Sequence, residues 1–249
     1  MGAIRLWDPQ ASTVERLPGA LVVSREQPGL MALPHWHAQA EVNYVFRGSV
    51  EYQMAGHRVR LEAGALALFW GGLPHRVVDT GPDTYFHAVH LPLSQFFRLR
   101  LPPGLQGRLM RGATLVAAEP EAEDAPAFTR RGPWLASDDP RLVAHALDEL
   151  LLRLERIALG AHRVLEAGGA PADALAEGAP GSQGIQRICG FIAETFREEI
   201  DAEAIALSAG LHPKYAMSLF KRCTGMTLNE YVGLMRVSYA QALLLEGNA

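Results

Sequence analysis

The strongest constraint on the fold is a change of pattern along the chain. Residues 20–91 form short apolar runs separated by turns, whereas apolar residues after about position 185 recur at helical spacing. The clearest strands, 50–54 and 57–61, flank an Ala-Gly turn and predict a hairpin. Many short strands in close succession are typical of a sandwich or barrel. The pattern therefore predicts an α+β protein, with an N-terminal β-barrel followed by helices and then by an all-α domain.

The chain divides into four predicted regions. Its 249 residues are enough for more than one hydrophobic core. We expect a barrel at 1–100, a helical region at 101–160, a flexible linker at 161–184 and a helical domain at 185–249. The linker prediction depends on the stretch 160–184, which holds six glycines and two prolines and has little periodicity.

The predicted helix after Pro140 has an apolar stripe at steps of three and four residues. Two interpretations remain open: the stripe packs on the barrel, or it forms the seam of a homodimer. Its members are Leu142, Val143, Ala146, Leu147, Leu150, Leu151, Leu154 and Ile157.

Composition limits the class of partner and the location. The net charge of −4 argues against a protein coated in nucleic acid, although it allows a small DNA-binding surface. No apolar run approaches the length of a membrane span, and the first residues lack a signal-peptide core. We therefore expect a cytoplasmic protein without a membrane partner. Cys189 and Cys223 both fall on predicted apolar helix faces, so we expect buried thiols and not a disulfide.

Four side chains could bind a metal ion in the barrel. Because side chains alternate along a strand, His35, His37, Glu41 and Asn43 share one face. A later Gly-rich stretch ends in His75 and offers a third imidazole. Three histidines and one glutamate are a plausible ligand set for a divalent Zn, Ni, Mn or Fe ion.

These two stretches resemble the paired motifs of the cupin family. Between Gly29 and Gly48, the HxH pair and the glutamate match the first motif at every position. In the second motif, Trp70 replaces the usual proline and Asp79 the usual asparagine. The resemblance implies a cupin barrel, and it leaves open whether the site holds a metal ion or is a metal-free polar pocket. The candidate effector-binding residues are His35, His37, Glu41, Asn43, Trp70 and His75, with the Trp70 indole as a stacking face for a sugar.

The helical domain contains a predicted helix-turn-helix. Asp201 is a suitable N-cap for a short helix at 202–208, and Gly210 can supply the turn through a positive φ. Pro213 suits the first turn of a second helix that runs to about residue 224. Two helices joined by a short Gly-containing turn are the organisation of this DNA-binding unit.

One face of the second helix is a candidate DNA-reading surface. Between His212 and Thr224 there are three basic residues and no acidic ones. Such a face suits the major groove, although an ordinary solvated helix face is an alternative. The candidate DNA-binding residues are Lys214, Met217, Ser218 and Lys221.

The segment GLHPKYAMSLFKRCTGMT at 210–227, with Tyr231 and Arg236, resembles the first helix-turn-helix of the AraC/XylS family. That resemblance implies a transcription regulator, not an enzyme, that binds double-stranded promoter DNA and senses a small effector, a sugar, in the cupin barrel. The homodimer is a hypothesis that depends on the apolar stripe of the helix after Pro140. Family members carry two such units joined by a long helix, expected here at 228–246. The chain ends at Ala249, so the resemblance implies C-terminal truncation and weak DNA binding. A cupin metalloenzyme of the dioxygenase or isomerase type, with a helical appendage, is the alternative.

Overall fold

The computed structural model describes residues 21–166 and 182–247, apart from 33, 36, 38, 55, 56, 74 and 225. Its strands are β1 (Val22–Glu26), β2 (Ala40–Arg47), β3 (Ser49–Met54), β4 (His57–Glu62), β5 (Leu66–Trp70), β6 (His75–Thr80), β7 (Tyr85–Leu91), β8 (Thr114–Ala117) and β9 (His162–Leu165). Its helices are α1 (Leu93–Arg98), α2 (Leu105–Met110), α3 (Asp124–Leu135), α4 (Pro140–Leu159), α5 (Ser182–Thr195), α6 (Ala202–Ser208), α7 (Pro213–Thr224) and α8 (Leu228–Gly247).

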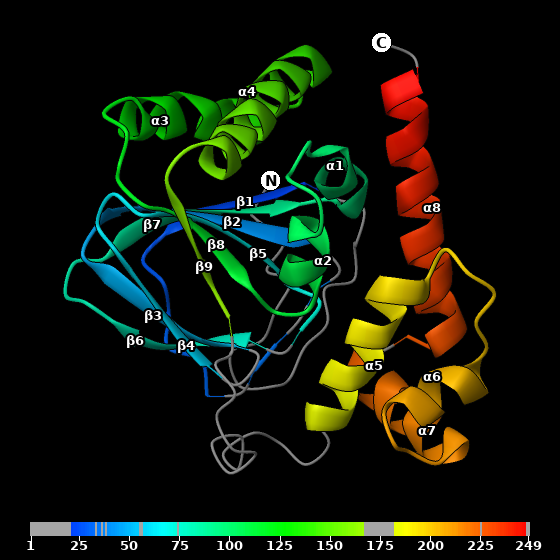
Figure 1. Ribbon diagram of the computed structural model, residues 1–249. Helices are drawn as coiled ribbons and strands as arrows, with labels where there is room; N and C mark the ends of the chain where they lie inside the picture. The colour runs from blue at the N-terminus through cyan, green and yellow to red at the C-terminus, as the bar shows by residue number, and fades with distance from the viewer. Residues whose placement is uncertain are drawn as a thin grey trace.

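Two antiparallel sheets face each other in the N-terminal part (Figure 1). One has the strand order β1-β7-β2-β5-β8-β9 and the other the order β4-β3-β6. The predicted hairpin is confirmed: β3 and β4 pair with Met54 opposite His57. Between the sheets lies an apolar cluster that includes Val45, Tyr52 and Phe86. This part of the chain is therefore the predicted barrel.

Strand β2 shows how the sheet separates polar and apolar side chains. Ala40, Val42 and Tyr44 belong to the apolar cluster that extends to the helices. Alternation then turns Glu41 and Asn43 toward the barrel interior, on the same side as Val45. Both polar side chains are nevertheless almost fully buried, so each must find hydrogen-bonding partners inside the barrel.

Helices α3 and α4 cover the outer face of the larger sheet (Figure 1). The ring of Phe128 in α3 stacks on Tyr44 of β2, with 4.7 Å between the ring centroids. The apolar stripe of α4 packs within the same chain, and six of its eight members are buried: Ala146, Leu147, Leu150, Leu151, Leu154 and Ile157. Packing on the barrel therefore accounts for this stripe.

Strands β8 and β9 differ from the prediction. They pair with each other and extend the larger sheet, although 114–117 lies in the predicted helical region and 162–165 in the predicted linker. Each strand has four residues, too few to show a periodicity in the sequence. Residues 167–181 of the predicted linker and 1–20 of the predicted barrel lie outside the described residues.

The helix-turn-helix prediction is confirmed by the backbone. Helix α6 has the predicted bounds, and the Ala204 N–H donates to the Asp201 carboxylate at 2.8 Å. Gly210 has a φ of +68°, and α7 begins at Pro213. Helix α8 begins behind a capping box in which Thr227 and Glu230 bond each other's backbone N–H.

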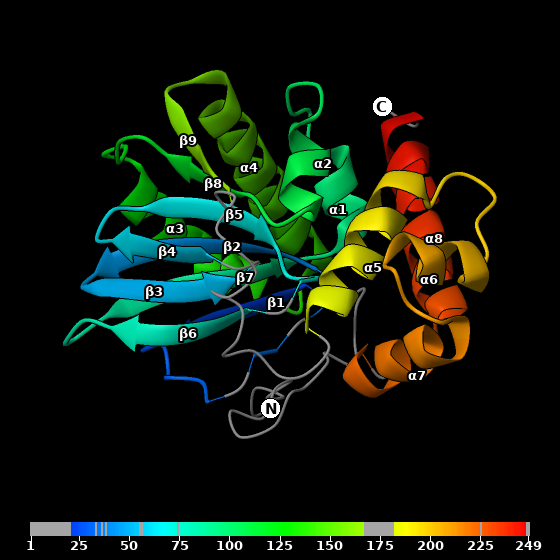
Figure 2. The ribbon, with the colours of Figure 1, turned by 60° about the horizontal axis from the view of Figure 1, so that its bottom comes forward.

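The two predicted domains share one hydrophobic core. A single apolar cluster runs from Val42 and Leu68 of the sheet to Ile192, Phe220 and Met235 of the helices. Helix α8 packs on α1, and α5 packs on α2 (Figure 2). None of the described helices combines the length and hydropathy needed to cross a membrane.

The two cysteines can be followed only in part. Cys189 is a buried free thiol, as expected. The side chain of Cys223 lies outside the described residues.

Candidate metal centre and DNA-binding helix

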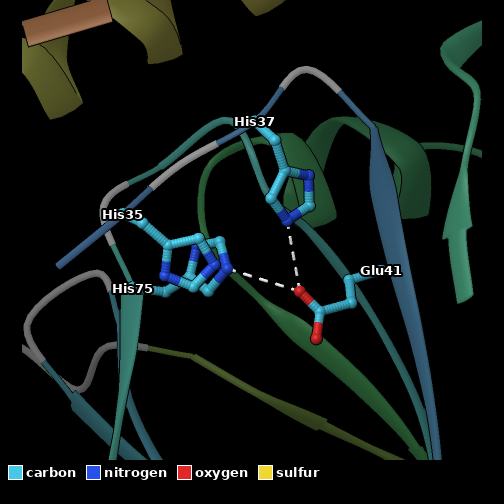
Figure 3. Close-up of side chains that lie close together, drawn as sticks. All are labelled: His35, His37, Glu41 and His75. Carbon is cyan, nitrogen blue, oxygen red and sulfur yellow. Dashed lines mark hydrogen bonds and ion pairs between the residues drawn. The ribbon is translucent and has the colours of Figure 1, made fainter. Parts of the chain in front are cut away.

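Backbone hydrogen bonds hold the HxH segment against the two ends of the connection between β5 and β6. His35 and His75 exchange two N–H···O bonds of 2.9 Å, and the His37 N–H donates to the Gly71 carbonyl at 2.9 Å. Glu41 follows on β2. The predicted ligands His35, His37, Glu41 and His75 are thereby brought together: all are buried, and one ligand atom from each lies within 4.8 Å of the others (Figure 3).

The Glu41 carboxylate is the centre of this cluster. Its Oε2 atom lies 3.2 Å from His37 Nε2 and 3.3 Å from His75 Nε2. Its Oε1 atom accepts hydrogen bonds from Asn43 Nδ2 at 3.0 Å and from the Tyr52 hydroxyl at 3.4 Å. One oxygen therefore faces the imidazoles while the other is held in place by two donors.

Burial and hydrogen bonding fix the charge states of the cluster. Burial lowers the pKa of His37 to about 3, and it holds the pKa of His35 well below its usual value. Burial alone would raise the pKa of Glu41, but hydrogen bonds from His37 and His75 outweigh it and leave that pKa well below its usual value. At neutral pH, the imidazoles of His35 and His37 are therefore neutral and the Glu41 carboxylate is ionised.

These residues fit a divalent transition-metal ion. Neutral imidazole nitrogen and carboxylate oxygen are the ligand atoms that such ions prefer. Ligands at about 2.0–2.1 Å from a tetrahedral ion lie about 3.3 Å from one another. The distances of 3.2 Å and 3.3 Å from Glu41 Oε2 to the two Nε2 atoms agree with that spacing.

A cavity of about 50 Å³ opens beside the cluster. His35, Glu41 and His90 are among its polar lining, and the other walls are largely apolar, with Met31 and Phe86 among them. A volume of this size holds a few water-sized groups. The cavity is thus polar at the end next to the cluster and apolar elsewhere.

Two predicted effector residues differ in their placement. Asn43 is fully buried and bonds Glu41, so it supports the cluster from inside the barrel. The prediction for Trp70 is wrong: its indole belongs to the apolar cluster shared with the helices and not to the cavity lining. The side chain that faces inward from β5 is its neighbour Phe69, whose ring centroid lies 5.3 Å from that of His75.

His90 is a site residue that the sequence analysis missed. It lies directly opposite Glu41 in the pairing of β7 with β2, and its Nε2 is 3.8 Å from Glu41 Oε2. Its ring stacks on His37 with 4.3 Å between centroids. No motif marks it, and only the strand register reveals its position.

The predicted DNA-reading face of α7 is exposed. Lys214, Met217, Ser218 and Lys221 are all solvent-accessible. The opposite face, with Ala216, Leu219 and Phe220, is buried. Helix α7 lies at the end of the molecule away from the sheets (Figure 2), so the barrel leaves this face uncovered. DNA contact by these four residues stays a prediction.

Comparisons with known proteins extend over both parts of the chain. The family described as Cupin domain matches residues 22–90. The melibiose operon regulatory protein of Escherichia coli strain K12 is 29 % identical over 221 residues, which cover 87 % of this chain and 72 % of that protein. The crystal structure of the AraC-like transcriptional activator CuxR superposes with a TM-score of 0.50 at 13 % identity, over 90 % of this chain and 78 % of that one.

The aligned regions extend beyond the cupin match into the helical part. The cupin expectation and the AraC/XylS expectation are both confirmed by these matches. The chain therefore contains a region that matches the Cupin domain family, is similar in sequence to the melibiose operon regulatory protein over most of its length, and is similar in fold to an AraC-like activator.

Proposed function

We propose that this chain is a cytoplasmic transcription regulator that reads promoter DNA with α7 and senses a small effector in the barrel. The observation that carries the DNA-binding role is the exposed face of α7. It presents Lys214 and Lys221 to solvent, and the helix contains no acidic residue. A helix of this kind can enter the major groove, where lysines meet phosphates and base edges.

Titration of a fluorescent duplex from the region upstream of the chain's own gene tests this role. If each lysine neutralises one phosphate, it adds about 0.9 to the slope of log affinity against log salt. Raising the salt from 50 to 200 mM should lower the DNA affinity of both proteins. The fold loss of affinity should be about twelve times smaller in the double variant K214A/K221A than in wild type. The matched control is R163Q, which removes an exposed cation from β9. Equal salt slopes in K214A/K221A and wild type would refute the assignment.

The barrel site is the proposed effector pocket. His35, His37, Glu41 and His75 would hold one divalent Zn, Ni, Mn or Fe ion, with Asn43 supporting Glu41. Once bound, the ion would supply a Lewis acid that attracts an oxygen atom of the effector. The residues of the cluster would exclude water and fix the orientation of that oxygen.

Elemental analysis of untagged protein tests the metal. We expect close to one ion per chain, and its loss in H35A and E41A. A metal content far below stoichiometric in wild type would overturn the metal site, and the cluster would then be a metal-free polar pocket.

A sugar is the proposed effector class, and the name of the E. coli relative refers to melibiose. Pockets for ligands of that size measure roughly 300 Å³ or more, so the 50 Å³ cavity must widen to admit a disaccharide. Calorimetric titration with melibiose and with galactose tests the class. Binding that is lost in E41Q supports it, whereas heats equal to those of dilution for both sugars would reject it.

A cupin metalloenzyme is the alternative function. The similarity to a regulator over 87 % of the chain favours regulation, since an enzyme would need only the barrel. Metal-dependent turnover of a small substrate that disappears in H35A would reverse this preference.

A homodimer is also proposed, although not through the stripe of α4, because that stripe is buried within the chain. Sedimentation at tens of micromolar tests it. A monomer at that concentration would reject the dimer.

A further inference from the structure

His90 lies beside the four-residue cluster and lines the same cavity as His35 and Glu41. Its ring is parallel to that of His37 within 15°, and its Nε2 is the third imidazole nitrogen within 4 Å of Glu41 Oε2. The His90 side chain is 14 % exposed, compared with 1–5 % for His37, Glu41 and His75. A group that enters the cavity and reaches Glu41 is therefore also next to His90.

His90 is also close in sequence to the helices. Strand β7 ends at Leu91, Pro92 is the N-cap of α1, and α1 begins at Leu93. The proline has a φ of −52°, and its ring restricts rotation at this junction. A displacement of His90 is therefore transmitted to α1 over a short and stiff connection.

Helix α1 carries one ring of an aromatic contact with the DNA-binding part. The Phe97 ring lies 5.6 Å from that of Phe196, which follows α5, and 5.4 Å from that of Tyr239 on α8. The Phe196 and Tyr239 rings are 5.6 Å apart, so the three rings contact one another. We refer to Phe97, Phe196 and Tyr239 as the aromatic contact.

Polar interactions reinforce this contact on the helical side. Arg236 of α8 donates to the carbonyls of Phe196 and Glu198 at 2.6 Å each. The Arg197 guanidinium lies over the rings of both Phe196 and Tyr239. The segment after α5 and helix α8 therefore meet α1 as one unit. A small shift of α1 would re-pack this interface as a whole.

We propose that His90 is a positioning residue that couples occupancy of the barrel site to the docking of α8 on α1. This inference rests on the proposed function and adds a route from the pocket to the helices. An occupant that binds Glu41 and His37 changes the surroundings of the His90 ring, and the end of β7 adjusts. The change alters the aromatic contact and hence the placement of the DNA-binding part. Such coupling requires the occupant to bind one arrangement better than the other.

Hydrogen–deuterium exchange of the whole chain, with and without Zn²⁺ alone, tests the proposal. In wild type we expect Zn²⁺ to change exchange in α1 and α8 by about fivefold or more, the lower range of allosteric coupling. In H90A Zn²⁺ should still bind more tightly than it binds H35A, because His90 lies outside the proposed set of four ligands, while the α8 response disappears. The matched control is H87N. His87 is on the same strand, but its side chain lies on the outer face of the sheet next to Phe128 of α3, so this variant should respond like wild type.

Three results would overturn the proposal. They are an α8 response in H90A equal to wild type, an α8 segment indifferent to Zn²⁺ in wild type, and a loss of Zn²⁺ affinity in H90A as large as in H35A. H90Q, which keeps a polar side chain at this position, replaces H90A if the alanine variant misfolds, and the same outcomes apply. The variant Y239A removes one ring of the aromatic contact, so it should abolish the effect of Zn²⁺ on exchange in α8 but not in α1. V237A, on the exposed face of α8, should leave both effects unchanged. Failure of the DNA-binding role would appear separately, in the duplex titration of K214A/K221A.

Discussion

Gly71 allows the geometry of the proposed metal site to be tested without altering a ligand. A Cβ atom at this position would lie 2.1 Å from Cε1 and 2.6 Å from Nε2 of the His37 ring. Ordinary contacts of this kind measure 3.4–4 Å, so the ring in G71A must move by more than an ångström. Metal ligands must be placed within about 0.2 Å of their ideal distances. The imidazole can rotate away, so the protein should fold while losing one ligand.

We expect G71A to bind Zn²⁺ about 10- to 100-fold more weakly than wild type, the range measured when ligand orientation is disturbed. Competition with a chromogenic chelator measures the affinity, and circular dichroism checks the fold. Overpacking should lower the free energy of unfolding by about 1–3 kcal/mol.

The adjacent glycine provides the control. In G72A the new Cβ would meet the Trp70 ring at 2.2 Å, on the opposite side of the strand from His37. This variant should be destabilised to a similar degree, about 1–3 kcal/mol, yet keep its Zn²⁺ affinity. A folded G71A protein with wild-type affinity would refute the assignment of His37 as a ligand.

Three further predictions concern stability, each measured by urea unfolding. D124N should lower the free energy of unfolding by about 3 kcal/mol, because Asp124 and Arg153 form a buried pair at 2.6 Å and 2.8 Å. The control for D124N is the surface variant E62Q, which should change the free energy of unfolding by less than about 0.5 kcal/mol. Burial lowers the pKa of His87 to about 4. The contribution of this neutral side chain to the free energy of unfolding is therefore fully present above pH 6.5. It is lost as the pH falls from 6.5 to 4, because the unfolded chain binds a proton in this range and the folded chain does not. From pH 7 to 5 this loss is about 1 kcal/mol after allowance for solvent screening, and H87N should remove it. D201A should cost about 1 kcal/mol through loss of the α6 cap.

Each of these predictions has a contradicting result. A value for D124N no larger than that for E62Q would show that the buried pair contributes nothing. Equal pH dependence in H87N and wild type would assign the loss of stability to other groups. An unchanged unfolding midpoint in D201A would mean that the Asp201 cap is replaced by another donor–acceptor pair.

The ligand cluster was predictable because its spacing lies within a short stretch of sequence. His35, His37 and Glu41 are close together in sequence, and the Gly-rich loop before His75 matched a known pattern. The face of Trp70 was not predictable, because all five residues of β5 are buried. With no polar side to the strand, nothing in its hydrophobic pattern shows which residues face the interior.

Long-range pairing explains the other misses. His90 becomes a site residue only through its register opposite Glu41. Strands β8 and β9 depend on each other across a long stretch of chain, with Thr114 opposite Leu165. By contrast, α6 and α7 were predicted closely, since caps and turn glycines are local signals.

The shared hydrophobic core has a consequence for how such a protein can be handled and how it can evolve. Ile192 and Met235 lie in the same apolar cluster as Leu68 of the sheet. Expressing residues 21–166 or 182–247 alone would leave each fragment with an uncovered apolar surface, which favours aggregation. Exchange of either part with that of a relative would need matching substitutions on the other side of the interface. The β-sheet part and the helical part are therefore expected to be inherited as a single unit.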